Sequence, residues 1–259
     1  MNEPHIIFEN DDFVVIDKPA GLMVHAARVS AAKIKRNKVI ERLQEPTLTD
    51  WLVAHWPAMA TVGDDPVLRP GIVHRLDKGT SGVMIVAKTQ ASFEAFKKLF
   101  QSHEMKKTYA ALVVGIPKDE KGIIDRPIGI KNGTLKRSIH AATMAKPAMT
   151  EYEVKKKYRV VGTNTNASLP EQEHALLEVR PKTGRTHQIR VHLASIGHPI
   201  VGDPLYGSHR PDAVLRLMLH ARALEFNDGT GNSFAFEAPL PADFTEVIHR
   251  VAHDASSIW

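Results

Sequence analysis

The sequence contains no cysteine, and this absence excludes several classes of protein. Without thiols there is no disulfide scaffold, no thiolate zinc site and no cysteine nucleophile. The chain also lacks an apolar run long enough to cross a bilayer, and its first residues do not form a secretion signal. No Walker loop or Gly-x-Gly-x-x-Gly motif is present, so nothing supports a nucleotide cofactor. These absences predict a soluble, cytoplasmic protein that is not attached to a membrane.

The charge balance is only mildly basic. Lys and Arg total 34 and Asp and Glu total 29, which gives a net charge of +5 over 259 residues. A charge of this size permits a nucleic-acid partner but is equally common in metabolic enzymes. A dense basic stretch lies within about residues 27–46. It is either a solvated loop or helix face, or a contact for an RNA backbone.

Apolar patterns predict many strands and few helices. Strands are predicted in an N-terminal hairpin at 6–16 and at 71–76, 83–87, 109–114 and 175–179. Helices are predicted after a cap at Thr49, from Ser92, at about 186–196 before Gly197, and around 244–251. Because strands and helices do not alternate regularly, we expect an α+β (mixed α/β) fold with a largely antiparallel sheet.

The first cluster of chemically useful side chains lies at 74–82. If residues 71–77 form a strand, Arg75 and Asp77 project from one face at its end, and His74 projects from the other. The glycine-rich turn that follows leaves the carboxylate of Asp77 uncrowded. Asp77 is therefore either a reactive carboxylate or a turn former whose ion-pair partner is Arg75.

A second cluster, at 180–192, holds four cations and two histidines across a predicted strand-turn-helix junction. Ile189 and Leu193 form the predicted buried stripe of the helix, which leaves Arg190 near the edge of that stripe. A helix N-terminus beside Arg185 suits a phosphate, and the alternative is a solvated basic helix start. The two histidines are five residues apart and no His-Glu-x-x-His motif is present, so we predict no metal site.

With these clusters in this order, the sequence resembles the RluA family of RNA pseudouridine synthases over about residues 5 to 250. The matching motifs are His74-Arg75-Leu76-Asp77, Thr80-Ser81-Gly82, Lys107-Thr108-Tyr109 and Thr183-Gly184-Arg185-Thr186-His187-Gln188-Ile189-Arg190-Val191-His192. Supporting matches are Lys18-Pro19-Ala20-Gly21-Leu22 and Gly202-Asp203-Pro204-Leu205-Tyr206-Gly207. The resemblance implies a single catalytic domain over 1–259, in which helices flank a large, mostly antiparallel central sheet with a central active-site cleft. It also implies a basic insertion at about 27–46, and no separate N-terminal RNA-binding domain is expected.

The resemblance further implies an isomerase that converts uridine to pseudouridine without a metal or a cofactor. Asp77 is the implied catalytic carboxylate, which either attacks the sugar or abstracts a proton to give a glycal. Arg190 is the implied partner that keeps this carboxylate anionic and aimed. Tyr109 is expected to pack against the uracil ring and to assist proton removal.

The implied partner is structured RNA, from which the target base must be flipped out. Arg75 is expected to enter the vacated space, Arg185 to bind phosphate, and His74 and Lys107 to contact the RNA. Large-subunit ribosomal RNA is the expected target and tRNA the alternative, with a monomer as the expected assembly. A catalytically silent RNA-binding or RNA-chaperone protein on the same scaffold is a further alternative, and a metal-dependent nucleoside hydrolase a more remote one.

Overall fold

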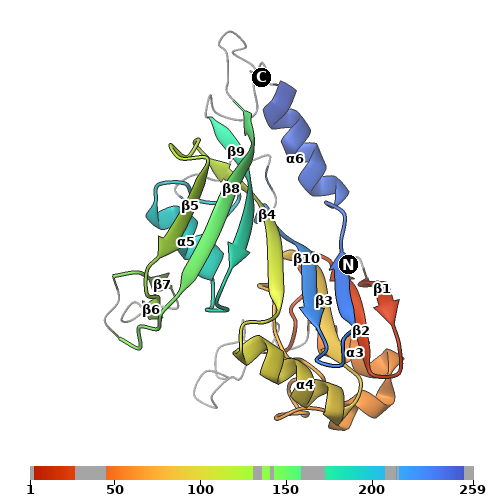
Figure 1. The fold of residues 1–259 in the computed structure, drawn as a ribbon. Coiled ribbons are helices and arrows are strands. Elements are labelled where there is room, and N and C mark those ends of the chain that lie inside the picture. Colours follow the sequence, from red (N-terminus) through yellow and green to blue (C-terminus); the bar gives the residue numbers. More distant parts are fainter. Residues whose placement is uncertain are drawn as a thin grey trace, which may run out of the picture. The chain divides into compact units, whose positions relative to one another are not determined.

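The structure, a computed structural model, describes residues 3–26, 45–130, 136–140, 143–158, 173–207, 214 and 216–253. The basic segment predicted at about 27–46 therefore lies outside the described residues, apart from its last two. The chain forms two compact units, Met1–Met105 with Phe226–Phe236, and Lys106–Glu225 with Glu237–Trp259 (Figure 1). The expectation of a single domain over 1–259 stays a prediction.

The first unit contains a small antiparallel sheet and two capped helices. Its elements are β1 (His5–Glu9), β2 (Phe13–Lys18), α3 (Leu48–His55), the 3-10 helix η1 (Pro57–Thr61), β3 (Ser81–Ala87), α4 (Gln90–Gln101) and most of β11 (Ser233–Glu237). Strand β2 pairs with β1 on one side and β3 on the other, antiparallel in both cases. The predicted N-terminal hairpin is confirmed.

Both helices of the first unit begin with a capping box, and both begin earlier than predicted. Thr47, not Thr49, caps α3, because its hydroxyl accepts from the Asp50 backbone N–H while the Asp50 carboxylate accepts from the Thr47 backbone N–H. Likewise Thr89 caps α4, and Ser92, the third residue of the helix, is the second member of the capping box. Ser92 therefore belongs to the helix start but is not its first residue.

An aromatic cluster forms part of the core of the first unit. The Phe13 ring lies 5.3 Å from the Phe96 ring and 6.3 Å from the Phe226 ring, between centroids. The cluster also includes the rings of Phe8, Phe234 and Phe236. Phe226, Phe234 and Phe236 come from the ends of β10 (Leu219–Asn227) and β11, which are joined by a tight turn. Residues far apart in the sequence therefore share one hydrophobic core.

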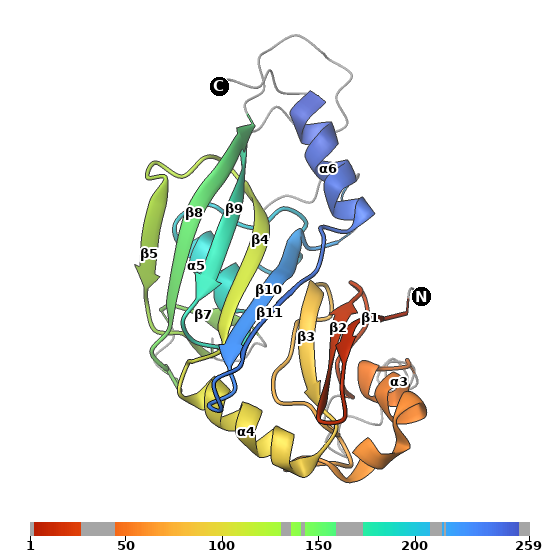
Figure 2. The same ribbon diagram turned by 45° about the vertical axis from the view of Figure 1, so that its right-hand side comes forward.

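The second unit is built on a five-stranded antiparallel sheet in the order β10, β4, β9, β8, β5. Its elements, besides β10, are β4 (Lys106–Val114), β5 (Lys121–Asp125), β6 (Gly129–Ile130), β7 (Arg137–Ser138), β8 (Met149–Tyr158), β9 (His174–Pro181), α5 (Gln188–Ser195) and α6 (Ala242–His253). Helix α5 packs against β8 and β9 (Figure 2). Phe244, Val247 and Val251 place the apolar stripe of α6 in the core, as predicted.

These elements confirm the α+β class, since every strand pairing within the units is antiparallel and the helices do not alternate with parallel strands.

The strand predicted at 71–76 does not form. The backbone N–H of Ile85 on β3 donates to His74 Nε2 at 3.1 Å, so a side chain takes the place of a neighbouring strand's carbonyl. The side chains of this segment still point to the predicted sides, because Ile72 and Leu76 are buried and Arg75 is exposed. No helix among the described residues is long and apolar enough to cross a membrane.

A buried histidine in β10 predicts a loss of stability in mild acid. Burial lowers the pKa of His220 from 6.5 to about 4. Between these values the unfolded chain binds a proton that the folded chain rejects, so the free energy of unfolding falls as the pH drops. A shift of this size corresponds to about 3 kcal/mol.

His220→Gln keeps a donor toward the Ala238 carbonyl oxygen, which lies 3.2 Å from His220 Nε2, but does not titrate. Urea unfolding should therefore show a shallower loss of stability for the variant between pH 6.5 and pH 4. Parallel pH profiles for the two proteins would contradict this prediction.

Candidate active site

Asp77 lies in a tight turn that leads into β3. Its carbonyl oxygen accepts a hydrogen bond from the Thr80 backbone N–H at 3.0 Å, and β3 begins at the next residue, Ser81. The Asp77 side chain is half-buried, and Leu76 before it is buried. The backbone therefore fixes the turn without using the carboxylate of Asp77 for the bond that closes it.

A buried lysine supports the segment beside this turn. Lys18 is fully buried, and its Nζ donates to the carbonyl oxygens of Pro19 at 2.7 Å and Leu22 at 2.9 Å. The enclosed bend contains Gly21 at φ +90°, whose N–H donates to the Lys78 carbonyl oxygen at 2.7 Å. No role was predicted for Lys18 from the sequence, although its place at the end of an apolar strand, just before Pro and Gly, could have indicated a structural lysine. Through its two hydrogen bonds, Lys18 holds the bend at residues 19–22 beside the Asp77 turn.

The other two predicted residues of this cluster differ in exposure. His74 is half-buried, stacks on Phe100 with ring centroids 4.6 Å apart, and accepts the β3 backbone bond described above. Arg75 is exposed. His74 therefore has a structural role in fixing its segment to β3, whereas the exposed Arg75 side chain suits contact with a partner. The predicted RNA contacts of both residues stay predictions.

In the second unit, Arg190 forms a buried two-point ion pair with Asp203. Arg190 Nε donates to Asp203 Oδ2 and Arg190 Nη2 donates to Asp203 Oδ1, both at 2.8 Å. The two residues are 5% and 1% exposed, so the prediction that Arg190 lies near the edge of the buried stripe is wrong. The predicted stripe residues Ile189 and Leu193 are buried, and so are the other residues of the first turns of α5. The helix packs on more than one side, which the apolar pattern alone did not indicate.

The carboxylate of Asp203 stays ionised despite its burial. Burial raises the pKa of Asp203, but hydrogen bonds from Arg190 and from the backbone N–H groups of Leu205 and Tyr206 outweigh it and hold the pKa below 3.8. In the sequence analysis the Gly202–Gly207 motif supported the family resemblance, but no role was predicted for Asp203 within it. The structure gives this acid a partner in the second cluster.

Tyr206 links the same pair to the loop before α5. Its ring lies under the Arg190 guanidinium, with Cζ 5.2 Å from the ring centroid. Its hydroxyl accepts from the Arg137 backbone N–H at 2.9 Å and lies 2.9 Å from His187 Nδ1. His187 has a left-handed backbone with φ 57°, which is uncommon for a residue other than glycine. The start of α5 is thus held by side-chain contacts rather than by an N-cap hydroxyl.

Gln188 organises the loop that carries Arg185. Its Oε1 accepts from the Thr183 hydroxyl at 2.6 Å and from the Arg185 backbone N–H at 3.0 Å, and its Nε2 donates to the Met149 carbonyl oxygen at 2.9 Å. Arg185 Nε donates to the Pro147 carbonyl oxygen at 3.0 Å. Helix α5 ends in a Schellman motif at Gly197, as predicted. Arg185 and Arg190 therefore lie on one loop and helix that these hydrogen bonds connect to β8 and to the segment before it.

Lys107 and Tyr109 lie two residues apart on β4, so their side chains share one face of the strand. Both are half-buried, and Tyr109 is opposite Val179 of β9 on one side and Ala221 of β10 on the other. Burial lowers the pKa of Lys107. A tyrosine fixed on a central strand beside a partly desolvated cation suits contact with a planar, polar ring.

Two of the three lysines of β8 are paired with carboxylates. Lys155 lies 3.3 Å from Glu153, and Lys157 lies 2.8 Å from Glu120. Residues 155–157 are part of this strand. Because these cations already have acidic neighbours, this face offers less attraction to phosphates than the lysine count suggests.

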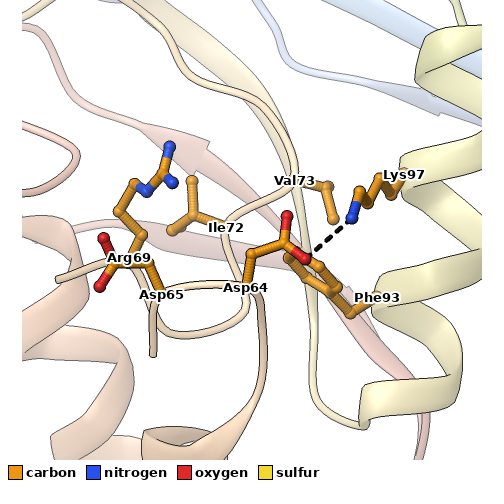
Figure 3. Close-up of a pocket in the computed structure, with 7 residues that line it drawn as sticks. All are labelled: Asp64, Asp65, Arg69, Ile72, Val73, Phe93 and Lys97. Carbon is orange, nitrogen blue, oxygen red and sulfur yellow. Dashed lines mark hydrogen bonds and ion pairs between the residues drawn. The ribbon is translucent and has the colours of Figure 1, made fainter. Parts of the chain in front are cut away.

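A small pocket in the first unit is not formed by the predicted site residues. It has a volume of about 110 Å³ and is lined by Asp64, Asp65, Arg69, Ile72, Val73, Phe93 and Lys97 (Figure 3). An ion pair of 2.8 Å between Lys97 and Asp64 lies across it. The volume is below the range of about 300–1,000 Å³ that is usual for ligand sites, so the pocket is too small for a nucleotide. Among the described residues, no group of three His, Asp or Glu side chains could hold a metal ion.

Comparison with known proteins identifies the family. The sequence profile described as RNA pseudouridylate synthase matches residues 12–195, which include Asp77, Tyr109 and Arg190. The chain belongs to the RNA pseudouridylate synthase family. The resemblance inferred from the motifs is thereby confirmed, and Asp203 lies outside the range that the profile matches.

Relatives of this RNA pseudouridylate synthase family resemble nearly the whole chain. A protein of Nitrosomonas europaea named ribosomal large subunit pseudouridine synthase D is 39% identical over 95% of this chain and 64% of its own length. The protein of the same name from Pseudomonas aeruginosa is 35% identical over 97% of this chain and 73% of its own length. The chain thus spans less than two thirds of the length of the Nitrosomonas protein and less than three quarters of that of the Pseudomonas protein. The solved structure of human RNA pseudouridylate synthase domain containing 1 has a TM-score of 0.68 and 25% identity, over 92% of this chain and 84% of that one.

Proposed function

We propose that the protein is an RNA pseudouridine synthase that isomerises specific uridines of large-subunit ribosomal RNA. The observation that carries the proposal is the Asp77 motif followed by the Thr183–His192 motif, both within the range matched by the family profile. The names of the relatives from Nitrosomonas and Pseudomonas favour ribosomal RNA over tRNA. Such a substrate would place the protein in the cytoplasm, where we expect it to act as a monomer.

The reaction breaks the bond between uracil N1 and ribose C1′ and forms a bond between uracil C5 and the same carbon. The C5 proton is lost and N1 gains a proton, so the product is an isomer of the substrate. Asp77 either attacks C1′ as a nucleophile or removes the C2′ proton to give a glycal. Both routes need an ionised carboxylate beside the sugar, and the partly exposed turn that carries Asp77 suits that role.

The remaining residues are proposed to position the carboxylate and the nucleotide. Arg190, which two hydrogen bonds to Asp203 hold in place, is proposed to assist the reaction of Asp77. Tyr109 packs against the uracil ring and assists removal of the C5 proton after the new bond forms. The exposed Arg75 enters the space left by the flipped base.

Two further side chains are proposed to act on the RNA itself, and a third is proposed to support one of the RNA contacts. Arg185 binds a phosphate from the rigid loop before α5, and Lys107 contacts the nucleotide from β4. His74 contributes chiefly by fixing the segment that carries Arg75, as its backbone hydrogen bond to Ile85 indicates. Binding through the cations should weaken as salt concentration rises.

The proposal is tested by tritium release from RNA that carries tritium at C5 of uridine. Wild-type protein should release tritium from large-subunit ribosomal RNA, and pseudouridine mapping should locate the product at specific positions. Release only from tRNA would reassign the substrate. Binding of RNA without release from any cellular RNA would instead support a silent RNA-binding protein, and EDTA-sensitive release of free uracil would support a hydrolase.

A further inference from the structure

The buried carboxylate of Asp203 accepts four hydrogen bonds, and two of them come from Arg190, a proposed catalytic residue. Both of its oxygens accept from the Arg190 guanidinium, and Oδ1 also accepts from the backbone N–H groups of Leu205 and Tyr206 at 2.8 and 3.1 Å. Its side chain has no exposed surface. The backbone bonds fix Asp203, and Asp203 in turn fixes the guanidinium.

We propose that Asp203 is a positioning residue that sets the orientation of Arg190 for the reaction of Asp77. The inference rests on the proposed function. An arginine side chain has several rotatable bonds, and a single ion pair would leave its planar head free to turn. Two parallel hydrogen bonds remove that freedom, because they fix both the position and the plane of the guanidinium.

The geometry also sets which part of Arg190 faces away from Asp203. The fork uses Nε and one N–H of Nη2, so the N–H groups of Nη1 and the outer N–H of Nη2 point in other directions. The Tyr206 ring covers one face of the guanidinium. Arg190 therefore has a fixed donor geometry on the side away from Asp203, and fixed geometry is what the positioning of a reacting group requires.

Asp203 could instead serve only to hold the turn that contains Leu205 and Tyr206. Asp203→Asn separates the two roles, because the amide oxygen can still accept the backbone N–H groups. The amide nitrogen that replaces the second oxygen is a donor and meets the Arg190 Nε–H, so the fork is lost. A merely structural role would lower thermal stability without changing the chemical step of the folded enzyme.

The experiment measures kcat and KM for tritium release, together with the melting temperature. Asp203→Asn is expected to lower kcat about 10²-fold, with KM for RNA changed less than about threefold. Asp243→Asn is the matched control, because Asp243 forms a similar fork with Arg216, at 2.5 and 2.7 Å, at the start of α6. The control should leave kcat unchanged.

Arg190→Lys completes the test, since it keeps a charge opposite Asp203 but cannot form the fork. It should lower kcat at unchanged KM, and adding Asp203→Asn to it should lower kcat little further, because the orientation is already lost. This variant also decides the question if Asp203→Asn fails to fold, because wild-type turnover by Arg190→Lys would overturn the proposal.

Two other outcomes overturn it as well. One is wild-type kcat in folded Asp203→Asn, and the other is an undiminished effect of Asp203→Asn in the Arg190→Lys background. If wild-type protein itself releases no tritium, the proposed function fails and the inference fails with it, which is distinguishable from failure of the inference alone.

Discussion

Asp77→Asn is expected to lower tritium release from C5-labelled uridine RNA by about 10³-fold or more. The reaction needs an anionic oxygen at the sugar, whether for attack on C1′ or for proton removal, and an amide supplies neither. The variant should fold normally. The turn is closed by the backbone bond from Thr80 to the Asp77 carbonyl oxygen, which the substitution leaves in place.

RNA binding and the melting temperature should be close to those of the wild type, so the loss is assigned to the chemical step. Asp64→Asn is a suitable control in the same unit, because Asp64 forms an exposed ion pair with Lys97. Its activity should match the wild type. Substantial tritium release by Asp77→Asn would remove Asp77 from the reaction and with it the proposed assignment of the motif.

Arg190→Met is expected to abolish turnover and also to destabilise the second unit. The substitution leaves the buried carboxylate of Asp203 without its guanidinium, which typically costs about 3–5 kcal/mol in the free energy of unfolding. Burial without the arginine should raise the pKa of Asp203 above its usual range. The penalty is then largest at neutral pH and shrinks in acid, where the carboxyl is protonated in both the folded and unfolded states.

Urea unfolding of Arg190→Met and wild type at several pH values checks this prediction. The double variant Arg190→Met/Asp203→Asn should recover stability but not turnover, because it removes the uncompensated charge without restoring the guanidinium. Arg216→Met should cost less than about 1 kcal/mol, since its partner Asp243 is half-exposed. A double variant as unstable as Arg190→Met would show that the unpaired charge is not the cause.

The motifs predicted the family of this chain, and the periodic patterns predicted part of its local structure. The fold class, the hairpin at the N-terminus, and the helix that ends just before Gly197 followed from apolar spacing and turn residues. The order of the Asp77 and Arg190 motifs was enough to identify the family that the profile match confirms. Local signals of this kind depend on neighbours in the sequence, which a single chain displays directly.

Features set by distant residues could not be predicted in the same way. The strand expected at 71–76 is absent because the His74 side chain takes a backbone N–H of β3. Arg190 is buried because Asp203, thirteen positions further along, supplies a compensating charge. Neither partnership has a periodic signature. Similarly, the choice of Thr47 over Thr49 as helix cap depends on which hydroxyl meets the Asp50 N–H.

The aromatic cluster around Phe13 has a consequence for the synthesis of the protein. Phe226, Phe234 and Phe236 complete a core whose other members lie in the N-terminal part of the chain. A chain emerging from the ribosome therefore cannot close this core until almost its whole length has been made. The aromatic cluster of the N-terminal part, which also carries Asp77, therefore stays incomplete while the strands of the second unit are translated. We therefore expect a chain that stops before Phe226 to carry the Asp77 motif on an unfinished fold and to release no tritium from RNA.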